Sequence, residues 1–451
     1  MILAIAAAMT SVQQSAVMPL LPRMRDALHV PLTTAAWAVT ISLLCGAVAT
    51  PLLGRLGDLY GRRRMLLVTL AALLAGSVLG ALSTSLAILL VARALQGCSA
   101  ALVPLAIGAV RDALPAQKAP VGISVVTATM GTGVGGGLVL SGLVSRWMPG
   151  YHAVFWVIAG LAALVLALTA QIVRDVNAPP GGSLDLPGAA LLIMALTCAL
   201  LAIGQGTKWG WGSPRTTLVF IAAALLFAIW VEVEKRCAAP LIAIPMLVHR
   251  GTVGASVAAL ALGFALFGGF ALIPTFAQAN RALGYGFDAS VLEAGLCLLP
   301  TALLMLVMSP WTGRLVPVCG ASTLVAVGAL ITALSDIWLM VSHDRIGDLL
   351  VASSLFGLGL GLGFAALGVM AVEHVPAEKT AVASAINSLS RLTGGSLAGA
   401  VTSAIFAADT IPQTTLPSER AYVISFGLIA AAAAACAIVT WVFRFRSLRV
   451  S

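Results

Sequence analysis

One stretch of eleven residues, from Gly54 to Arg64, holds four arginines, one aspartate and three glycines. Only 9% of the chain is charged, so this concentration of charge needs a physical reason. The glycines Gly57 and Gly61 allow positive φ and hence a short reversal between two helices. Asp58 can accept N–H bonds at a helix start, while the arginines that follow can face anionic lipid headgroups. We therefore predict a charged contact between helix ends here; the alternative, a loop that only fixes topology, needs neither the glycine spacing nor the acid.

Two further arginines lie inside apolar segments, where a charge is costly unless it faces a partner or a wet cavity. Arg93 stands about seven residues into one segment, and Arg391 about twelve residues into another, close to mid-membrane. The alternative for Arg93 is a side chain that extends to the outer headgroups, and for Arg391 a structural ion pair. We expect both residues to act in binding or coupling.

A glycine-rich run, Gly131 to Gly137, satisfies the pattern G-x-G-x-x-G but lies inside an apolar segment and follows no predicted strand. A dinucleotide site is therefore not expected. Glycines in such a segment let two helices approach closely. The run is predicted to be a packing surface.

Composition places these residues in a polytopic helical membrane protein. Hydrophobic residues make up 60% of the 451 positions and charged residues only 9%. Soluble domains carry about 25% charged residues. No basic patch interleaved with aromatic residues suggests a nucleic acid, and the seven cysteines have no metal or disulfide spacing. No phosphate-binding loop, H-E-x-x-H or G-x-S-x-G motif occurs, so we expect neither an enzyme nor a cofactor or metal. The first apolar segment begins at Ile2 with no basic segment before it, which does not indicate a cleavable signal.

About fourteen apolar segments are long enough to cross a bilayer. An even number places both termini on one side, and the bias of Lys and Arg in the loops makes that side cytoplasmic. Arg23 and Arg25 depart from this bias. The segments are predicted near residues 2–22, 35–54, 65–84, 86–112, 119–145, 150–172, 184–205, 214–235, 251–276, 288–309, 317–341, 346–372, 379–406 and 421–443.

An internal repeat with an offset of about 260 residues predicts the domain organisation. It aligns the segments that begin at Leu90 and Leu350, at Pro115 and Pro376, and at Gly54 and Gly313, so that Gly61 falls on Gly320. The expected division is a six-helix bundle at 1–172, two inserted helices at 173–250, and a second six-helix bundle at 251–451. A Pro/Gly-rich linker, Asn177 to Gly182, opens the insert.

The charged stretch resembles the signature loop of the major facilitator superfamily, between its second and third helices. The matching positions are Gly54, Asp58, Gly61, Arg62 and Arg63. The resemblance implies that these residues control the change of conformation between access states. With fourteen segments, the chain is similar to the drug:proton antiporter branch of that superfamily.

Other motifs of that branch are present in altered form. The run from Arg93 through Gln96 to Gly97 resembles the fourth-helix motif, whose arginine is linked to proton coupling, so the resemblance implies a coupling or substrate role for Arg93 and Gln96. Trp37 resembles a tryptophan of the second helix, with an ordinary interfacial residue as the alternative. Gln13, followed by Gln14, occupies the place of an aspartate in the first helix; glutamine can hydrogen-bond a substrate but cannot carry a titrating proton. The glycines Gly131, Gly135 and Gly136 resemble the antiporter motif of the fifth helix in position and composition. The chain departs from that motif, because Gly136 stands at the position of its proline, and Val139 and Leu140 replace its closing glycine pair.

If protons drive transport, a carboxylate within the second bundle must carry them. Glu293 and Asp336 are the candidate acids within its predicted segments, although both could be ordinary interfacial residues. Glu293 is predicted to lie nearer to mid-membrane and is favoured. Arg391 is the buried cation placed to tune the acid.

The sequence thus predicts an all-α membrane protein with the major facilitator fold and fourteen transmembrane helices. The resemblance implies a secondary transporter in the bacterial inner membrane, which exports amphipathic drugs or small organic compounds in exchange for protons. The expected partners are a small-molecule substrate, protons and the lipid bilayer, with no nucleic acid, and the expected state is a monomer. The alternatives are a proton-independent or narrow-specificity metabolite exporter of the same fold, or a transporter-like receptor.

Overall fold

The computed structural model describes residues 1–447 except 31, 36, 116, 149, 175–184, 238–249, 374, 376–379 and 412–415. The described residues are almost entirely helical, and a single isolated bridge joins Thr410 to Pro417. The linker predicted at Asn177 to Gly182 and the repeat segment at Pro376 to Lys379 lie outside the described residues.

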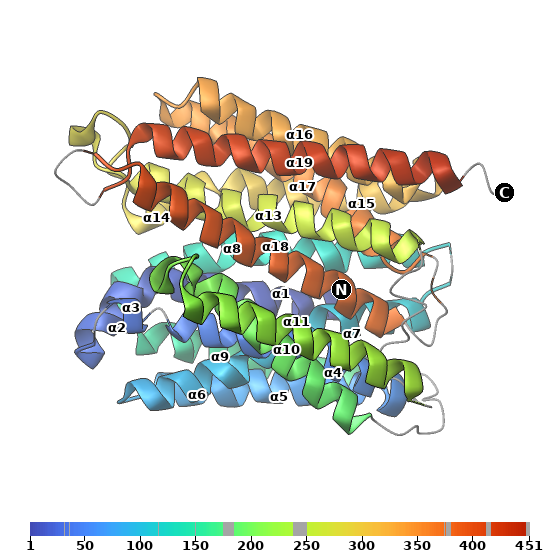
Figure 1. Cartoon of the computed structure of the whole chain (residues 1–451). Coiled ribbons are helices and arrows are strands. Elements are labelled where there is room, and N and C mark those ends of the chain that lie inside the picture. Colours follow the sequence, from blue (N-terminus) through green and yellow to red (C-terminus); the bar gives the residue numbers. More distant parts are fainter. Residues whose placement is uncertain are drawn as a thin grey trace.

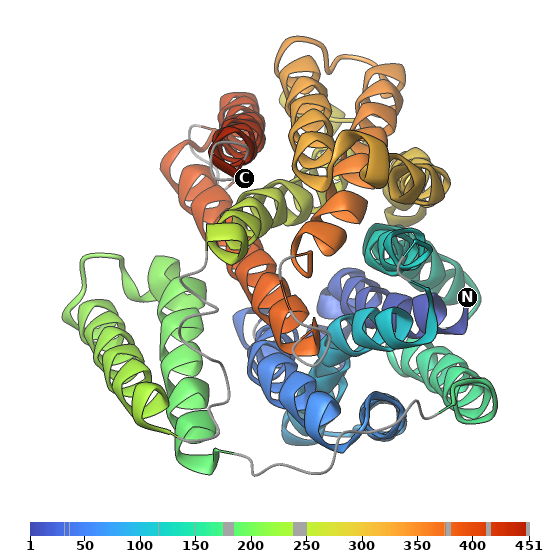
Figure 2. The ribbon, with the colours of Figure 1, turned by 90° about the vertical axis from the view of Figure 1, so that its right-hand side faces the viewer.

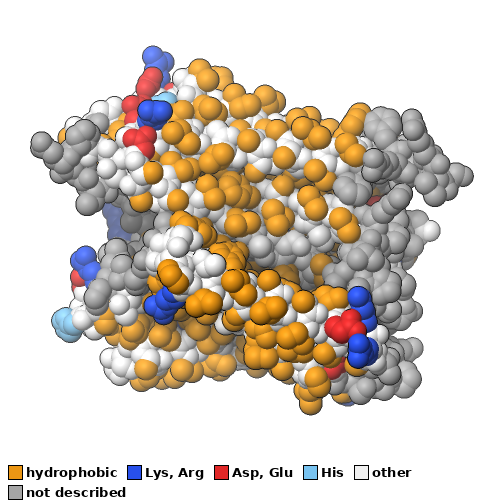
Figure 3. All heavy atoms as spheres, in the orientation of Figure 1, with side chains coloured by type: hydrophobic (Ala, Val, Ile, Leu, Met, Phe, Trp, Pro, Cys, Tyr) orange, Lys and Arg blue, Asp and Glu red, His pale blue; other side chains and the backbone are white. Residues whose placement is uncertain are grey.

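Helices dominate because apolar runs of membrane-spanning length must satisfy every backbone group internally. Thirteen described helices are long and apolar enough to cross a membrane, and α18 (Thr380–Ala408) adds a further helix of 29 residues. Figure 3 shows hydrophobic side chains over the middle of one flank, with charged side chains gathered toward the two ends. The predicted all-α polytopic membrane architecture is confirmed.

The first half of the molecule packs around a core that includes Leu66, Leu70 and Phe155. Residues Leu86 to Ala113 form one span, in which a short 3-10 segment, Cys98–Ala101, separates α6 from α7. The helices of this half are α1 (Ile2–Val17), α2 (Leu21–Leu28), α3 (Leu32–Ala35), α4 (Trp37–Tyr60), α5 (Arg62–Ala81), α6 (Leu86–Gly97), α7 (Leu102–Ala113), α8 (Ala119–Trp147) and α9 (His152–Ile172).

The second half packs around a core that includes Phe270, Phe356 and Phe364. Figure 1 shows it as the upper layer, in yellow to red, above the blue and cyan first half. Its helices are α13 (Arg250–Gln278), α14 (Val291–Cys297), α15 (Leu299–Cys319), α16 (Ala321–Val341), α17 (Ile346–Met370), α18 and α19 (Glu419–Ser447).

The inserted pair, α10 (Leu186–Trp209) and α11 (Pro214–Arg236), stands to one side of both halves (Figure 2). Helix α10 packs against α4 of the first half and α18 of the second. Small apolar clusters form this contact: one joins Leu196 and Trp230 to Ile386, and another joins Leu44 and Ala47 to Leu200. The pair therefore bridges the two halves.

The junction at Gly61 is tighter than expected, because α4 continues as a helix to Tyr60 and α5 begins at Arg62. Of the three glycines in the charged stretch, only Gly61 has a positive φ, at 103°. Gly320 has a φ of 81° and stands at the corresponding place between α15 and α16. The predicted eleven-residue turn is thus a one-residue break between two helices, and the repeat partner Gly320 makes the same kind of break.

Candidate functional site

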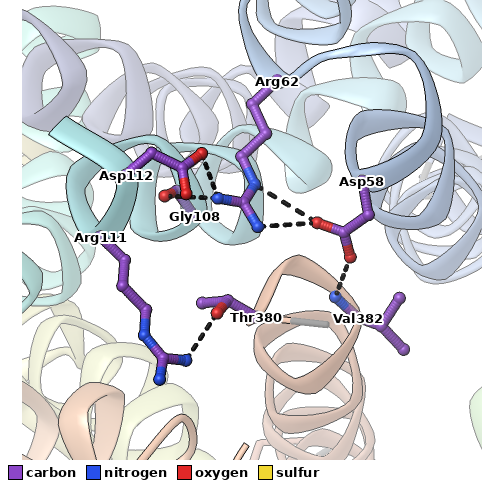
Figure 4. A network of polar contacts seen from close by, with 7 residues as sticks. All are labelled: Asp58, Arg62, Gly108, Arg111, Asp112, Thr380 and Val382. Carbon is purple, nitrogen blue, oxygen red and sulfur yellow. Dashed lines mark hydrogen bonds and ion pairs between the residues drawn. The ribbon is translucent and has the colours of Figure 1, made fainter. Parts of the chain in front are cut away.

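Three charged side chains meet where α4 and α7 end and α5 begins, at what we call the Asp58 end of the molecule (Figure 4). Arg62 Nη2 donates to Asp58 Oδ1 over 3.0 Å, and its Nε donates to the same oxygen over 3.3 Å. Arg62 Nη1 donates to the carbonyl of Gly108 over 2.9 Å and forms an ion pair with Asp112. Arg62 is only 9% exposed, so it does not face lipid headgroups as predicted but ties three helices of the first half together.

The same acid also reaches the second half. The backbone N–H of Val382, in the first turn of α18, donates to Asp58 Oδ2 over 3.3 Å (Figure 4). The first N–H groups of a helix have no partner within the helix, and its N-terminus carries partial positive charge. Asp58 therefore caps a helix start, as predicted, although the helix belongs to the opposite half.

A second contact across the halves lies beside it. Arg111, near the end of α7, donates through Nη1 to Thr380 Oγ1 over 2.6 Å and through Nη2 to the carbonyl of Val375 over 2.8 Å. Together with Asp58, Arg111 joins the first half to the start of α18 (Figure 4). We call these cross-half contacts the Asp58 seam.

Glycines make this packing possible. A Cβ built on Gly57 would lie 2.3 Å from Leu105 Cδ2, and one built on Gly108 would lie 2.5 Å from Arg62 Nε. Both distances are shorter than real Cβ contacts, so a side chain at either position would displace α7 or the guanidinium. Gly54 lies within α4, and Arg63 donates to the carbonyl of Ala170 over 2.8 Å.

A polar network is buried inside the first half. Arg93 is fully buried and donates to four neutral oxygens: Ala38 O over 2.9 Å, Gln13 O over 3.5 Å, Gln13 Oε1 over 2.7 Å and Gln96 Oε1 over 2.5 Å. Its Nη2 has no hydrogen-bond partner among the described residues. The guanidinium is thus held in the protein interior, and snorkelling to the headgroups is not what this structure shows.

The two glutamines extend the network to other helices. Gln13 Nε2 donates to Ser99 Oγ over 3.2 Å, and Gln96 Nε2 donates to Ser77 Oγ over 2.8 Å. This arrangement connects α1, α5 and α6, with each amide orienting Arg93 through its oxygen. Gln14 is half-buried beside it, and its Nε2 has no partner among the described residues.

The second half contains two buried charged residues that the sequence singled out, Arg391 and Asp336. Among the described residues, these two do not form an ion pair with each other. Arg391, 2% exposed, donates from Nη2 to Ser388 Oγ over 3.1 Å, and its Cζ lies 5.7 Å from the centre of the Phe364 ring. Asp336 of α16 is fully buried, and neither carboxylate oxygen has a partner among the described residues. Arg391 thus faces α17 within its own half.

Glu293 lies differently from the prediction. It is the third residue of α14 and is exposed, and its Oε2 accepts the N–H of Ser290 over 2.8 Å. Ser290 Oγ in turn accepts the N–H of Glu293, which completes a capping box. The segment begins at Val291 rather than near 288, so Glu293 stands at the helix start and not toward mid-membrane.

The glycines of α8 form the main contact between the halves. A Cβ on Gly131 would lie 1.8 Å from Met305 Sδ, and one on Gly135 would lie 2.9 Å from Ala302 Cβ, whereas Gly136 faces open space. The contact runs the length of the helices, because Gly313 meets Val121 near the Asp58 end and Gly142 meets Leu292 near the other. The run is the predicted packing surface.

A cavity of about 400 Å³ lies between the halves, displaced from the Asp58 end. It is bounded by the first part of α4, the second part of α10 and the later parts of α13 and α18. None of its lining residues is ionisable. They are Met18, Thr40, Leu43, Leu44, Ala47, Leu200, Gly204, Phe267, Gly268, Ala271, Leu272, Thr275, Leu392, Gly395, Ser396, Ala398, Gly399, Ala400, Thr402, Ser403 and Phe406.

None of the predicted coupling residues lines this cavity. Arg391 directly precedes the lining residue Leu392 but is itself buried. Trp37, one turn before Thr40, packs against the cluster that contains Leu44 and Leu200. Charged residues stand out in the sequence, whereas the cavity is lined by apolar and hydroxyl side chains that look ordinary in any membrane helix. Among the described residues, no group of three His, Cys, Asp or Glu side chains could hold a metal ion.

Comparisons with known proteins indicate the family. The family model described as Major Facilitator Superfamily matches residues 3–400. The tetracenomycin C resistance and export protein of Streptomyces glaucescens is 32% identical over 403 residues, which are 87% of this chain and 73% of that protein. The multidrug resistance protein Stp of Mycobacterium tuberculosis is 32% identical over 380 residues, which are 82% of this chain and 68% of that one.

A solved structure supports the fold. The crystal structure of the human organic anion transporter MFSD10 (TETRAN) matches with a TM-score of 0.69 over 97% of this chain and 98% of that one, at 14% identity. At this identity the likeness shows the fold alone. Since the family model covers most of the chain and the relatives match across both halves, this integral membrane protein belongs to the major facilitator superfamily of transporters.

Proposed function

We propose that this protein is a secondary active transporter that exports uncharged or weakly polar amphipathic organic compounds from the cytoplasm. The observation that carries the proposal is the cavity between the halves, together with the Asp58 seam, which joins the halves at the Asp58 end, away from the cavity. Two relatives whose names describe export or multidrug resistance support the same direction of transport.

Alternating access follows from this arrangement. The six-helix bundles at 1–172 and 251–451 rock about the contact of α8 with α15, and the insert at 173–250 remains against α4 and α18. In the conformation described here, the Asp58 seam closes one side while the cavity lies toward the other. With both termini and the Asp58 end in the cytoplasm, this is the outward-facing state of a monomer in the inner membrane. Opening of the Asp58 seam exposes the cavity to the cytoplasm.

The lining of the cavity defines the class of substrate. Small-molecule sites are typically 300–1,000 Å³ and mostly apolar, with a few polar groups that fix orientation. Here the hydroxyls of Thr40, Thr275, Ser396 and Ser403 supply those groups, and no charged side chain is present in the lining to pair with an ionic ligand. A charged substrate would lose its hydration without compensation, so neutral compounds are favoured.

Protons drive the export in our proposal, with Asp336 as the carrier in place of Glu293. A buried carboxylate without a hydrogen-bond partner is costly in its ionised form, which favours a bound proton in this conformation. Glu293, exposed and engaged in a helix cap, has no comparable reason to exchange a proton with the change of state.

A specific observation favours the second candidate, a proton-independent exporter. The buried Arg93 is oriented by the amides of Gln13 and Gln96, which do not titrate. The first half therefore holds its buried cation in the same way at every pH within the physiological range.

Transport into proteoliposomes tests both proposals. A panel of neutral, cationic and anionic fluorescent compounds is presented with and without a pH gradient. The primary proposal expects accumulation of neutral compounds only, driven by the gradient and lost in Asp336→Asn, which retains counterflow of labelled against unlabelled substrate. Full gradient-driven accumulation by Asp336→Asn would remove Asp336 as the carrier, and gradient-independent equilibration by the unmodified protein would favour the second candidate.

A further inference from the structure

The inserted helix α10 contributes directly to the cavity. Two of its residues, Leu200 and Gly204, line the space that α4, α13 and α18 otherwise enclose. Helix α10 reaches this position because Leu192 and Leu196 pack against Ile386 of α18, with Trp230 of α11 behind them. Figure 2 shows α10 beside both halves, and its lining residues Leu200 and Gly204 make it one wall of the cavity.

Most glycines in these helices are explained by close packing. A Cβ on Gly206 of α10 would lie 2.7 Å from the ring of Trp211. On α18, a Cβ on Gly394 would lie 2.0 Å from the carbonyl of Leu260, and one on Gly395 would lie 2.3 Å from Phe267. A larger residue at Gly394 or Gly395 would push apart helices that now touch, and one at Gly206 would displace the ring of Trp211.

Gly204 and Gly399 are different. A Cβ built on either residue meets no other atom within 4 Å, and both residues are exposed. Their φ angles are not in the positive region, so the backbone does not require glycine either. Glycine is among the least favourable residues inside a helix, so neither packing nor backbone geometry explains the choice.

Both residues line the same cavity, from opposite helices. Gly204 lies on α10, in the insert, and Gly399 lies on α18, in the second half. A side chain at either position would project into open space that belongs to the cavity. What the two glycines provide is therefore width in the cavity and bare backbone against which a flat apolar surface can lie.

We infer that α10 is a wall of the substrate site and that Gly204 and Gly399 set the largest substrate that the site accepts. The inference rests on the proposed function, because it assigns a role within the transport cavity. It gives the inserted helices a task in substrate selection, beyond connecting the halves. The class of substrate is a neutral compound with a broad apolar face, such as a fused-ring aromatic compound.

The test compares two neutral fused-ring dyes, one of two rings and one of four rings, in proteoliposomes that contain the full chain. Gly204→Phe and Gly399→Phe are expected to lower the uptake rate of the four-ring dye at least about tenfold and that of the two-ring dye less than about twofold, since overpacking penalises the larger ligand. Gly204→Ala and Gly399→Ala each add one methyl group. Their uptake rates for the four-ring dye are expected to lie between those of the phenylalanine variants and that of the unmodified protein.

Gly160→Phe is the matched control. Gly160 lies in the interior of α9, is exposed and also meets no atom within 4 Å, but it does not line the cavity. Gly160→Phe should leave the ratio of the four-ring to the two-ring uptake rate unchanged. A variant that misfolds would lower both rates together, and the ratio separates that effect from a change in selectivity.

An unchanged ratio in both phenylalanine variants, with both proteins monodisperse, would overturn the inference and leave the proposed export function intact. If the unmodified protein transports neither dye, nor any compound of the panel, the proposed function itself fails. A lower four-ring to two-ring ratio in Gly399→Phe alone would overturn the role of α10 as a selective wall.

Discussion

Asp58 is a single carboxylate with partners in both halves of the transporter. One oxygen accepts two donors from Arg62, and the other accepts the backbone N–H of Val382 at the start of α18. Both the carboxylate and the guanidinium are largely removed from solvent, and hydrogen bonds to charged groups contribute about 1.5–3 kcal/mol each. Asp58 thus stabilises the conformation in which the Asp58 seam is closed.

Asp58→Asn is expected to weaken the seam without unfolding the protein. Asparagine keeps an oxygen for one donor but loses the charge that pairs with Arg62, so the closed seam should lose about 1.5–3 kcal/mol, a shift of roughly 10- to 100-fold in the equilibrium between access states. We expect turnover in proteoliposomes to fall by at least about tenfold, while the yield of monodisperse protein stays near that of the unmodified chain.

Asp26→Asn is the control for this prediction. Asp26 pairs with Arg25 over 2.8 Å, but both side chains are exposed, and exposed pairs contribute about 0–1 kcal/mol. Normal turnover in Asp26→Asn beside lost turnover in Asp58→Asn supports the role of the seam. Normal turnover in both variants would reduce the charged stretch to a topology signal.

Arg93 should matter for stability as well as for transport. Its removal by Arg93→Leu leaves the oxygens of Ala38, Gln13 and Gln96 buried with one donor fewer, and a buried unsatisfied group costs about 1–3 kcal/mol. We expect a lower midpoint of thermal unfolding in detergent and loss of both driven transport and counterflow. Arg64→Leu, at an exposed position of α5, is the control and should leave the midpoint unchanged. An unchanged midpoint in Arg93→Leu would contradict the structural part of this role.

At the scale of the helices, one backbone conformation recurs at the two repeat-related junctions. Gly61, with φ 103° and ψ 129°, precedes α5, and Gly320, with φ 81° and ψ 144°, precedes α16. These values lie in a region that only glycine adopts without strain. Each junction reverses the chain in one residue, which places the end of one helix directly beside the start of the next.

Alanine at either junction should therefore be destabilising. We expect Gly61→Ala and Gly320→Ala each to lower the free energy of unfolding by about 1–3 kcal/mol, the usual cost of such backbone strain. Thermal unfolding in detergent measures this effect, and Gly160→Ala in the interior of α9 is the control, since it removes a helical glycine with neither strain nor contact. A midpoint for Gly61→Ala that matches the control would mean that the junction relaxes to another geometry.

The helices themselves could be predicted from sequence because apolar length decides them. The expected segment 119–145 corresponds to α8, which ends at Trp147, and 150–172 corresponds to α9. The end of α4 could not be predicted in this way, because Gly57 suggests a turn, whereas Gly57 lies within α4 and packs against Leu105 of α7.

The residues of the candidate site likewise include some that could be predicted from sequence and some that could not. Charged residues in apolar segments, such as Arg93, are conspicuous in sequence because burial of a charge needs a reason. The predicted depth of Glu293 was wrong, because the helix starts at a capping box that moves the acid to the surface. Gly204 and Gly399 were missed since a glycine that packs and a glycine that leaves space are identical in sequence, and only the positions of neighbouring atoms distinguish them.

At the scale of the whole molecule, the two contacts between the halves differ in kind. The contact of α8 with α14 and α15 is made by glycines and apolar side chains along its length, from Val121 to Leu292. The Asp58 seam is polar and confined to one end. A long apolar contact can remain while the halves rock, whereas polar contacts at one end can break and be replaced by water, so the structure favours the Asp58 seam as the gate.

Accessibility of a cysteine in the cavity can test this view of the whole transporter. Ser403 lines the cavity and is exposed, so Ser403→Cys, in a chain whose seven free cysteines are replaced by alanine, should react with a membrane-impermeant maleimide added from outside. Cysteines in place of Tyr60 and Ala282, which are exposed in loops or helix ends at opposite ends, fix the orientation: we expect labelling of position 60 only from the cytoplasm and of position 282 only from outside.

The same reporter connects the gate to the cavity. When Asp58→Asn is added to Ser403→Cys, weakening of the seam should move molecules toward the inward-facing state, so the rate of labelling from outside should fall and that from the cytoplasmic side should rise. The direction follows because the Asp58 contacts exist only while the seam is closed, and their loss cannot favour that state. Equal labelling rates with and without the Asp58→Asn substitution would show that the seam does not set the balance between access states. Labelling of positions 60 and 282 from the same side would instead contradict the proposed topology, and with it the assignment of the cavity to the outside.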